Sequence, residues 1–169
     1  MNDERNESLG HSQVFKVSQV IQEDHHQLEF YYNKIINSND PDEQKRYQNA
    51  FVWELARHSI AEELVVYPAL ERTISDGSGR AEKDRSQHQE KLSPSDEQFI
   101  PAIKGLWRDL STHIKEEEEE DLVRLEEAIS MTESKELASS FEKTKSFIPT
   151  RSHPNAPNKP PFETVISLM

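Results

Sequence analysis

A histidine interrupts the apolar stripe of each of four amphipathic segments in this chain. Within these segments apolar residues recur at alternating steps of three and four, the period of a helix that buries one face. The interrupted positions are His25, His58, His88 and His113. A buried polar side chain without a partner costs roughly 1–3 kcal/mol. The pattern therefore predicts an all-α protein whose interior contains a partner for four imidazoles.

The four segments predict an up-down-up-down four-helix bundle, because the connections between them are short. The expected helices span residues 14–37, 41–74, 80–92 and 97–130. A shorter fifth helix is expected over residues 133–147, with Thr132 as its N-cap. The chain then divides into a disordered leader (1–13), the bundle (14–130) and a C-terminal helix with an extended tail (131–169).

The second helix carries a start signal and a break. Asp40 is suited to cap it, Pro41 fits its first position, and Glu43 completes an arrangement like a capping box. Pro68 lies inside the helical pattern and removes one backbone donor. We therefore expect a kink near Leu64 or an early change of direction.

Composition narrows the functional classes. The net charge of −12 disfavours nucleic acid, whose phosphates need a basic face, and it also disfavours anionic lipid. No apolar run approaches the roughly 18 residues of a membrane span, and the polar start lacks a secretory signal. The absence of cysteine excludes disulfides and thiolate metal ligands. These features favour a cytoplasmic protein of one domain.

Two of the four histidines are followed by a glutamate one helical turn later. This spacing places imidazole and carboxylate about 40° apart on one helix face. Each such helix can give one terminal nitrogen and one bridging oxygen to a metal pair, and the other two helices each add a nitrogen. The predicted metal ligands are His25, His58, Glu62, His88, His113 and Glu117. A nitrogen and oxygen set without sulfur suits non-haem iron best, ahead of manganese or zinc.

The order His…HxxxE…His…HxxxE resembles the hemerythrin-like, HHE-type cation-binding family. The matching stretches are residues 23–25, 56–63, the region of His88, and residues 113–117. The tail at 150–154 and 160–165 is similar to the extension of fungal members. The resemblance implies a four-helix bundle that holds two irons, with Glu62 and Glu117 as the bridging carboxylates.

The third helix departs from the family pattern in two ways. Oxygen-carrying members place two histidines one turn apart there, whereas here Asp84 precedes His88 and Leu92 follows it. Either Asp84 replaces a histidine or one iron has an extra open site. Pro94 also shortens this helix to about 20 Å, at a rise of about 1.5 Å per residue. Because of this shortening, the sequence does not decide whether the metal site is fully occupied.

The acidic run at residues 116–121 offers two candidates for the second bridge. Oxygen carriers use a carboxylate five residues after the last histidine, and that position corresponds to Glu118. Helix geometry favours Glu117, because five residues rotate by about 140°. The remaining histidines, His11, His26 and His153, are expected on the surface or in the tails.

Three functions remain open at this point. The first is a di-iron protein that binds or senses dioxygen or peroxide, or handles iron. The second is a di-iron oxidoreductase that acts on peroxide or another small oxidant. The third is a metal-free helical interaction module, if the shortened third helix has lost the site. The sequence identifies no protein partner.

Overall fold

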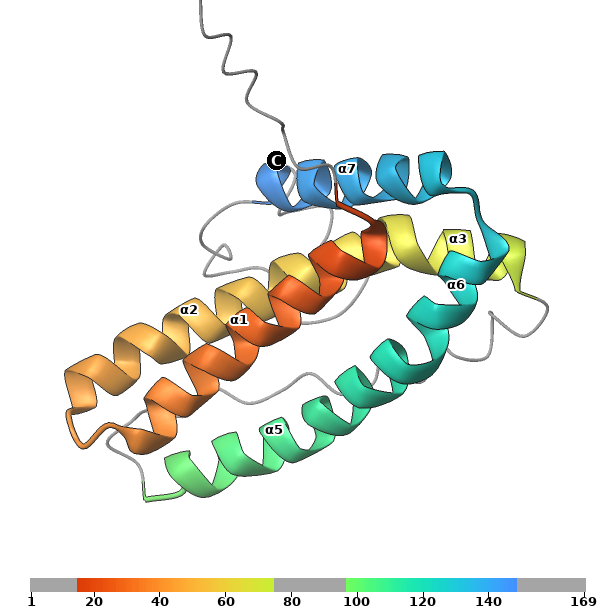
Figure 1. Cartoon of the computed structure of the whole chain (residues 1–169). Helices are drawn as coiled ribbons and strands as arrows, with labels where there is room; N and C mark the ends of the chain where they lie inside the picture. The colour runs from red at the N-terminus through yellow and green to blue at the C-terminus, as the bar shows by residue number, and fades with distance from the viewer. Residues whose placement is uncertain (1–14, 75–96, 149–169) are drawn as a thin grey trace, which may run out of the picture.

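Helices account for all regular structure in the two segments that the computed structural model describes, residues 15–74 and 97–148 (Figure 1). The first segment contains α1 (Val17–Asn37), α2 (Pro41–Ala61), the π-helical turn η1 (Glu62–Val66) and α3 (Tyr67–Thr73). The second contains α5 (Phe99–Glu116), the π-helical turn η2 (Glu117–Asp121), α6 (Leu122–Ala128) and α7 (Met131–Phe147). The predicted all-α fold is confirmed for these residues, whereas the expected helix at 80–92 lies outside them.

A three-residue turn joins α1 to α2, and its side chains define where α2 begins. Asp40 Oδ1 accepts a hydrogen bond from the Asp42 amide at 2.9 Å, and Pro41 takes the first helical position. The expected capping box is not formed. The Asp40 amide donates to Ser38 Oγ at 3.1 Å, and the same hydroxyl donates to Glu43 Oε2 at 2.7 Å. In a capping box, the Glu43 carboxylate would accept a hydrogen bond from the Asp40 amide. Here it accepts one from the Ser38 hydroxyl instead.

The second and fourth expected helices each contain a π-helical turn that begins at a glutamate. In η1 the Tyr67 amide donates to the Glu62 carbonyl, and in η2 the Leu122 amide donates to the Glu117 carbonyl. Each of these bonds spans five residues instead of four, so each turn accommodates one extra residue. Such turns occur often at functional sites.

Pro68 gives a physical reason for the first of these turns. It has no amide hydrogen to donate to Leu64, so the regular α-helical ladder is interrupted there. The structure places η1 at this point, where the sequence predicted a kink or a change of direction. No corresponding proline lies in η2 or in the turn after it.

The buried apolar residues form two clusters with the histidines of α1 and α2 between them. The first cluster joins α1, the end of α2, η1, α3, α6 and α7; the second joins α1, α2 and α5. His25 follows Ile21 of the first cluster and precedes Leu28 of the second. His58 lies between Leu55 of the second cluster and Ala61 of the first. The two imidazoles therefore occupy a polar layer inside an otherwise apolar core.

The fifth expected helix, α7, packs against α1, α2 and η1 (Figure 1). It begins at Met131, and Ser130 Oγ caps it by accepting from the Glu133 amide at 3.2 Å. The predicted cap, Thr132, is therefore wrong, because it already lies in the first turn. Phe141 of α7 is fully buried in the first apolar cluster, so α7 shares its core with the bundle.

Within the described segments, no helix combines the length and the apolar character needed to cross a lipid bilayer.

Candidate metal centre

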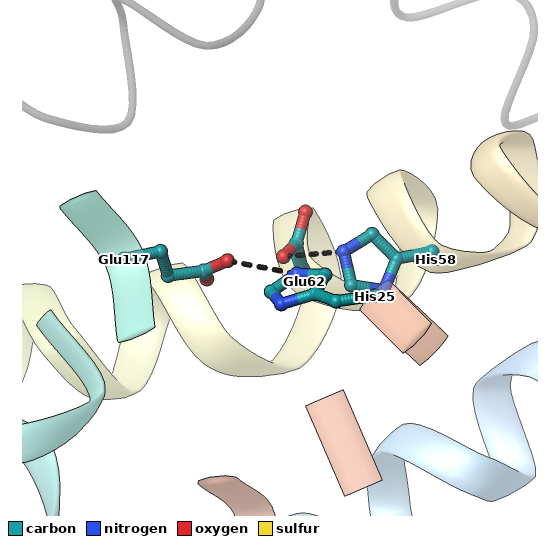
Figure 2. A group of neighbouring side chains, drawn as sticks. All are labelled: His25, His58, Glu62 and Glu117. Atoms are coloured by element: carbon teal, nitrogen blue, oxygen red, sulfur yellow. Dashed lines mark ion pairs between the residues drawn. The ribbon is translucent and has the colours of Figure 1, made fainter. Parts of the chain in front are cut away.

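Four of the six predicted ligands converge inside the bundle (Figure 2). His25 comes from α1, His58 from α2, Glu62 from η1 and Glu117 from η2, and each is at least 97% buried. One ligand atom from each lies within 4.8 Å of the others. His58 Nε2 is 2.9 Å from Glu62 Oε1, and His25 Nε2 is 3.3 Å from Glu117 Oε2. A group of this size and composition can hold a metal ion.

Several buried atoms of this group form no well-aligned hydrogen bond, although two pairs of them are in ion-pair contact. They are His25 Nε2, Glu62 Oε1 and both carboxylate oxygens of Glu117. The remaining oxygen of Glu62 accepts a long hydrogen bond of 3.4 Å from the Tyr67 hydroxyl. Buried polar atoms without hydrogen bonds are costly. Four of the six such side-chain atoms in the described structure belong to this group, and the other two are Trp53 Nε1 and Arg57 Nε. A cation between the four atoms of the group would satisfy their lone pairs together, so the side chains fit a metal site.

Each imidazole is held from behind by a further carboxylate. His25 Nδ1 lies 2.7 Å from Glu118 Oε1, and His58 Nδ1 lies 3.1 Å from Asp24 Oδ2. A carboxylate that accepts the Nδ1 proton leaves the Nε2 lone pair facing the centre of the group. Metal-binding histidines commonly use this arrangement, which fixes both the tautomer and the ring orientation.

The structure separates the two candidate bridges of the acidic run. Glu117 points into the group, while Glu118 contacts the outer nitrogen of His25. Consecutive carboxylates of η2 thus approach opposite nitrogens of one imidazole ring. The geometry favours Glu117 as the bridging candidate and gives Glu118 a supporting position.

The two central carboxylates respond differently to their burial. Burial acts to raise the pKa of Glu62, but the imidazoles of His58, His25 and His113 together outweigh it and lower that pKa. Burial and the nearby Glu62 carboxylate together raise the pKa of Glu117. Without a cation, one carboxylate is stabilised as an anion at the expense of the other. A metal ion between the two would favour the ionised form of both.

His58 is strongly basic in the metal-free site. Burial acts to lower its pKa, but the charge of Glu62 and the hydrogen bond to Asp24 raise it to about 10. For Asp24, burial acts to raise the pKa, whereas His58 and then Lys145 lower it. The metal-free protein therefore keeps a proton on His58 at neutral pH.

The remaining predicted site residues fall into two groups. His113 lies one turn before Glu117, is half-buried, and adds to the lowering of the Glu62 pKa after His58 and His25. His88 and Asp84 lie outside the described residues, as do two of the three histidines expected away from the site. The third of these, His26, is exposed, as expected.

Three buried charges behind the group were not predicted from the sequence: Asp24, Glu54 and Lys145. The sequence does contain a signal for Asp24 and for Lys145. Asp24 follows Ile21 by three residues and precedes Leu28 by four, so it lies on the buried stripe of α1. Lys145 follows the buried Phe141 by four residues on α7. A charge at such a position needs a partner, just as a histidine does.

Comparisons with known proteins identify the family of this chain. Residues 16–125 match the model of the hemerythrin HHE cation-binding domain. A hemerythrin-like protein of Schizosaccharomyces pombe is 48% identical over 163 residues, covering 90% of this chain and 80% of that protein. The chain belongs to the hemerythrin HHE cation-binding family. The family predicted from the sequence pattern is thereby confirmed.

A second relative of this hemerythrin-like chain is larger. A DNA nickase of Nostoc sp. is 25% identical over 146 residues, which are 82% of this chain and 42% of the nickase. No solved structure matches the chain. All four residues of the buried group lie inside the matched domain, whereas α7 begins after its end.

Proposed function

We propose that this hemerythrin-like protein binds a pair of non-haem iron ions and uses it to bind or sense dioxygen or peroxide, or to hold iron. The observation that carries the proposal is the convergence of His25, His58, Glu62 and Glu117, which are all at least 97% buried and have several atoms outside any hydrogen bond. Iron is preferred because the ligand atoms are nitrogen and oxygen and the chain has no cysteine.

We propose the same six ligands as the sequence predicts. Glu62 and Glu117 would bridge the two ions, because their carboxylates face each other across the group and each can offer two oxygens. His113 would join Glu117 from the same helix face, and His88 would complete the set. The supporting observation for His113 is its electrostatic effect on the Glu62 carboxylate.

Bound iron would supply ligand binding and electron transfer, and the protein would control both through its side chains. Asp24 and Glu118 hold the two imidazoles in one tautomer with Nε2 turned inward. The apolar clusters on either side exclude bulk water from this layer. A dry, oriented site of this kind favours selective binding of a small neutral ligand.

We do not extend the DNA-directed activity of the Nostoc relative to this chain. This chain corresponds to less than half of that protein, and its net charge of −12 opposes contact with a phosphate backbone. Oxygen, peroxide and iron are the ligands that fit an enclosed site of histidines and glutamates.

Iron analysis of the protein purified from iron-replete cells tests the proposal. We expect about two irons per chain, as in other di-iron carboxylate bundles, with near-ultraviolet absorption from the ferric form. A colourless protein with less than about one iron per chain would favour the metal-free scaffold instead. Turnover of peroxide by the iron-loaded protein would move the assignment to an oxidoreductase; reversible binding without turnover would support a carrier or sensor.

A further inference from the structure

Lys145 is a buried cation that reaches the polar layer from outside the matched domain. It lies on α7, is 6% exposed, and its Nζ forms an ion pair with Asp24 Oδ1. The same Nζ lies 3.1 Å from Glu54 Oε1 of α2. The family match ends at residue 125, so nothing in that match assigns a role to this lysine.

Asp24 connects this lysine directly to the candidate metal centre. Its Oδ1 contacts Lys145, and its Oδ2 accepts from His58 Nδ1 at 3.1 Å. The opposite nitrogen of His58 faces Glu62 at 2.9 Å. Three helices therefore form one chain of contacts that runs from α7 through α1 to the imidazole on α2.

We propose that Lys145 is a positioning residue for the metal centre: it holds Asp24 so that His58 presents Nε2 to the metal. This inference rests on the proposed metal binding and deepens it. It makes α7 part of the metal site in addition to its packing role.

The burial of these groups explains why the lysine has this effect. Asp24 is 6% exposed, so neither of its oxygens can turn to bulk water for a partner. Among the residues that the structure describes, each oxygen has one protein partner. Rotating the carboxylate to compensate for a lost lysine would withdraw it from His58. A buried charge that loses its partner is strongly unfavourable, so the carboxylate would reorient toward another partner. This reorientation would release the constraint on the imidazole.

The lysine is itself fixed on its other side. Glu54 is buried and pairs with Arg57 as well as with Lys145. Arg57 in turn stacks on Trp53, with its guanidinium carbon 3.6 Å from the ring centroid. Glu142 of α7 also lies 3.8 Å from Nζ, but its side chain is 54% exposed. The closer partners of the ammonium group are the two buried carboxylates of Glu54 and Asp24, and this placement is the condition for orienting Asp24.

A purely structural role, in which Lys145 only fastens α7 to the bundle, makes a different prediction. Loss of a fastening contact would lower the melting temperature and leave the coordination of a bound metal unchanged. Leu137 of α7 provides this comparison, since its apolar side chain packs against the first apolar cluster and has no polar atom that could form an ion pair. Lys143 is an exposed lysine on the same helix and controls for the chemical change.

The test uses the full chain with Lys145→Met, Lys143→Met and Leu137→Ala. Fe(II) affinity is measured by chelator competition without oxygen, and the absorption bands of the Co(II)-loaded protein report ligand geometry. We expect Lys145→Met to weaken Fe(II) binding about ten- to hundredfold, as loss of supporting contacts does at other metal sites, and to shift the Co(II) bands. Leu137→Ala should lower the melting temperature with unchanged bands, and Lys143→Met should match wild type.

The outcomes separate this inference from the function on which it rests. If wild type binds no Fe(II), the proposed function fails. If wild type binds Fe(II) and Lys145→Met has the same affinity and the same Co(II) bands, only the role of Lys145 is overturned.

A second comparison covers the case in which Lys145→Met does not fold. Asp24→Asn is compared with Asp24→Asn/Lys145→Met, which removes both partners of the ion pair. Because Lys145 acts through Asp24, the two variants should bind Fe(II) with affinities within about twofold of each other. A further tenfold loss in the double variant would show that the lysine acts by another route.

Discussion

The same HxxxE spacing occurs on two helices of this protein, but the two copies have different surroundings. His58 and Glu62 are almost fully buried, and Asp24 holds the imidazole from behind. His113 precedes Glu117 by the same four residues, yet its side chain is only half-buried. The difference shows that the motif sets the distance between two ligands on a helix, whereas neighbouring helices set their burial and orientation.

The helices that carry the two histidines, α2 and α5, also differ in how many of their residues are buried. Seven residues of α2 are buried, whereas Phe99 is the buried residue of α5 within the described structure. α2 packs against both α1 and α7, and the charges of all three helices meet behind His58. Within the described structure, the α2 side of the site therefore has the more buried side chains and the buried ion pairs.

The largest expected effect is loss of the metal when a central carboxylate is removed. Glu62→Ala and Glu117→Ala should each lose both irons, because each carboxylate is proposed to contact both ions. The melting temperature of the iron-loaded protein should fall as well, since bound metal stabilises the fold. Iron per chain is the measurement, with the exposed Glu71→Ala of α3 as the matched control. Normal iron content in Glu62→Ala would remove Glu62 from the bridge.

The second effect is a difference between His58 and His113 in their contribution to the stability of the metal-free protein. His58→Ala should lower the free energy of unfolding by about 3 kcal/mol, because it leaves Glu62 as a buried charge without its imidazole partner. His113→Ala should cost about 1 kcal/mol, since that side chain is only half-buried. Urea unfolding in the presence of a chelator measures both. Equal losses would show that the two copies of the motif are energetically alike.

The third effect is a dependence of both metal affinity and stability on pH. Since the pKa of His58 is about 10 in the metal-free site, the metal must displace its proton at any lower pH. Fe(II) affinity should rise about tenfold per pH unit for that proton. An affinity that stays flat between about pH 5 and pH 8 would contradict this role.

The stability of the metal-free protein should change with pH in the opposite direction to the metal affinity. A raised histidine pKa stabilises the fold fully below the unfolded value of 6.5, and that stabilisation is lost as pH rises toward about 10. Urea unfolding of metal-free wild type should therefore show declining stability across this interval. His58→Ala should show a smaller decline, because it lacks the titrating group.

The smallest effect concerns the support of His25. Glu118→Ala should weaken Fe(II) binding about tenfold without abolishing it, because Glu118 contacts the outer nitrogen and not the centre. The exposed Glu119→Ala serves as its control. Complete loss of iron in Glu118→Ala would make Glu118, and not Glu117, the bridging residue.

Much of the fold follows from local patterns in the sequence. The apolar stripes predicted the helices of the described segments to within a few residues, and Pro68 marked the position where η1 interrupts the second helix. The N-cap of α7 was predicted at Thr132 but lies at Ser130, although Ser130 and Glu133 have the spacing of a capping box. The error arose because neighbouring hydroxyl residues give similar signals.

The two π-helical turns mark the positions where the pattern of a regular α-helix no longer predicts which residues are buried. Glu117 and Leu122 are both buried but are five residues apart, a spacing that a regular α-helix would place on different faces. The same spacing separates Glu62 from Tyr67. A π-helical turn keeps both members of each pair on the buried side. Two residues that are suited to the interior and lie five positions apart were therefore the sequence signal for each π-helical turn.

The sequence by itself determined the helices, the family and the residues available to bind a metal, because helical periodicity and ligand spacing are local properties of the chain. Only the tertiary structure decided which charges are buried together. Lys145 and Asp24 are separated by 121 positions along the chain, and their pairing depends on how α7 packs against α1 and α2. Burial and charge pairing depend on which helices meet, and the periodicity of a single helix carries no information about its neighbours.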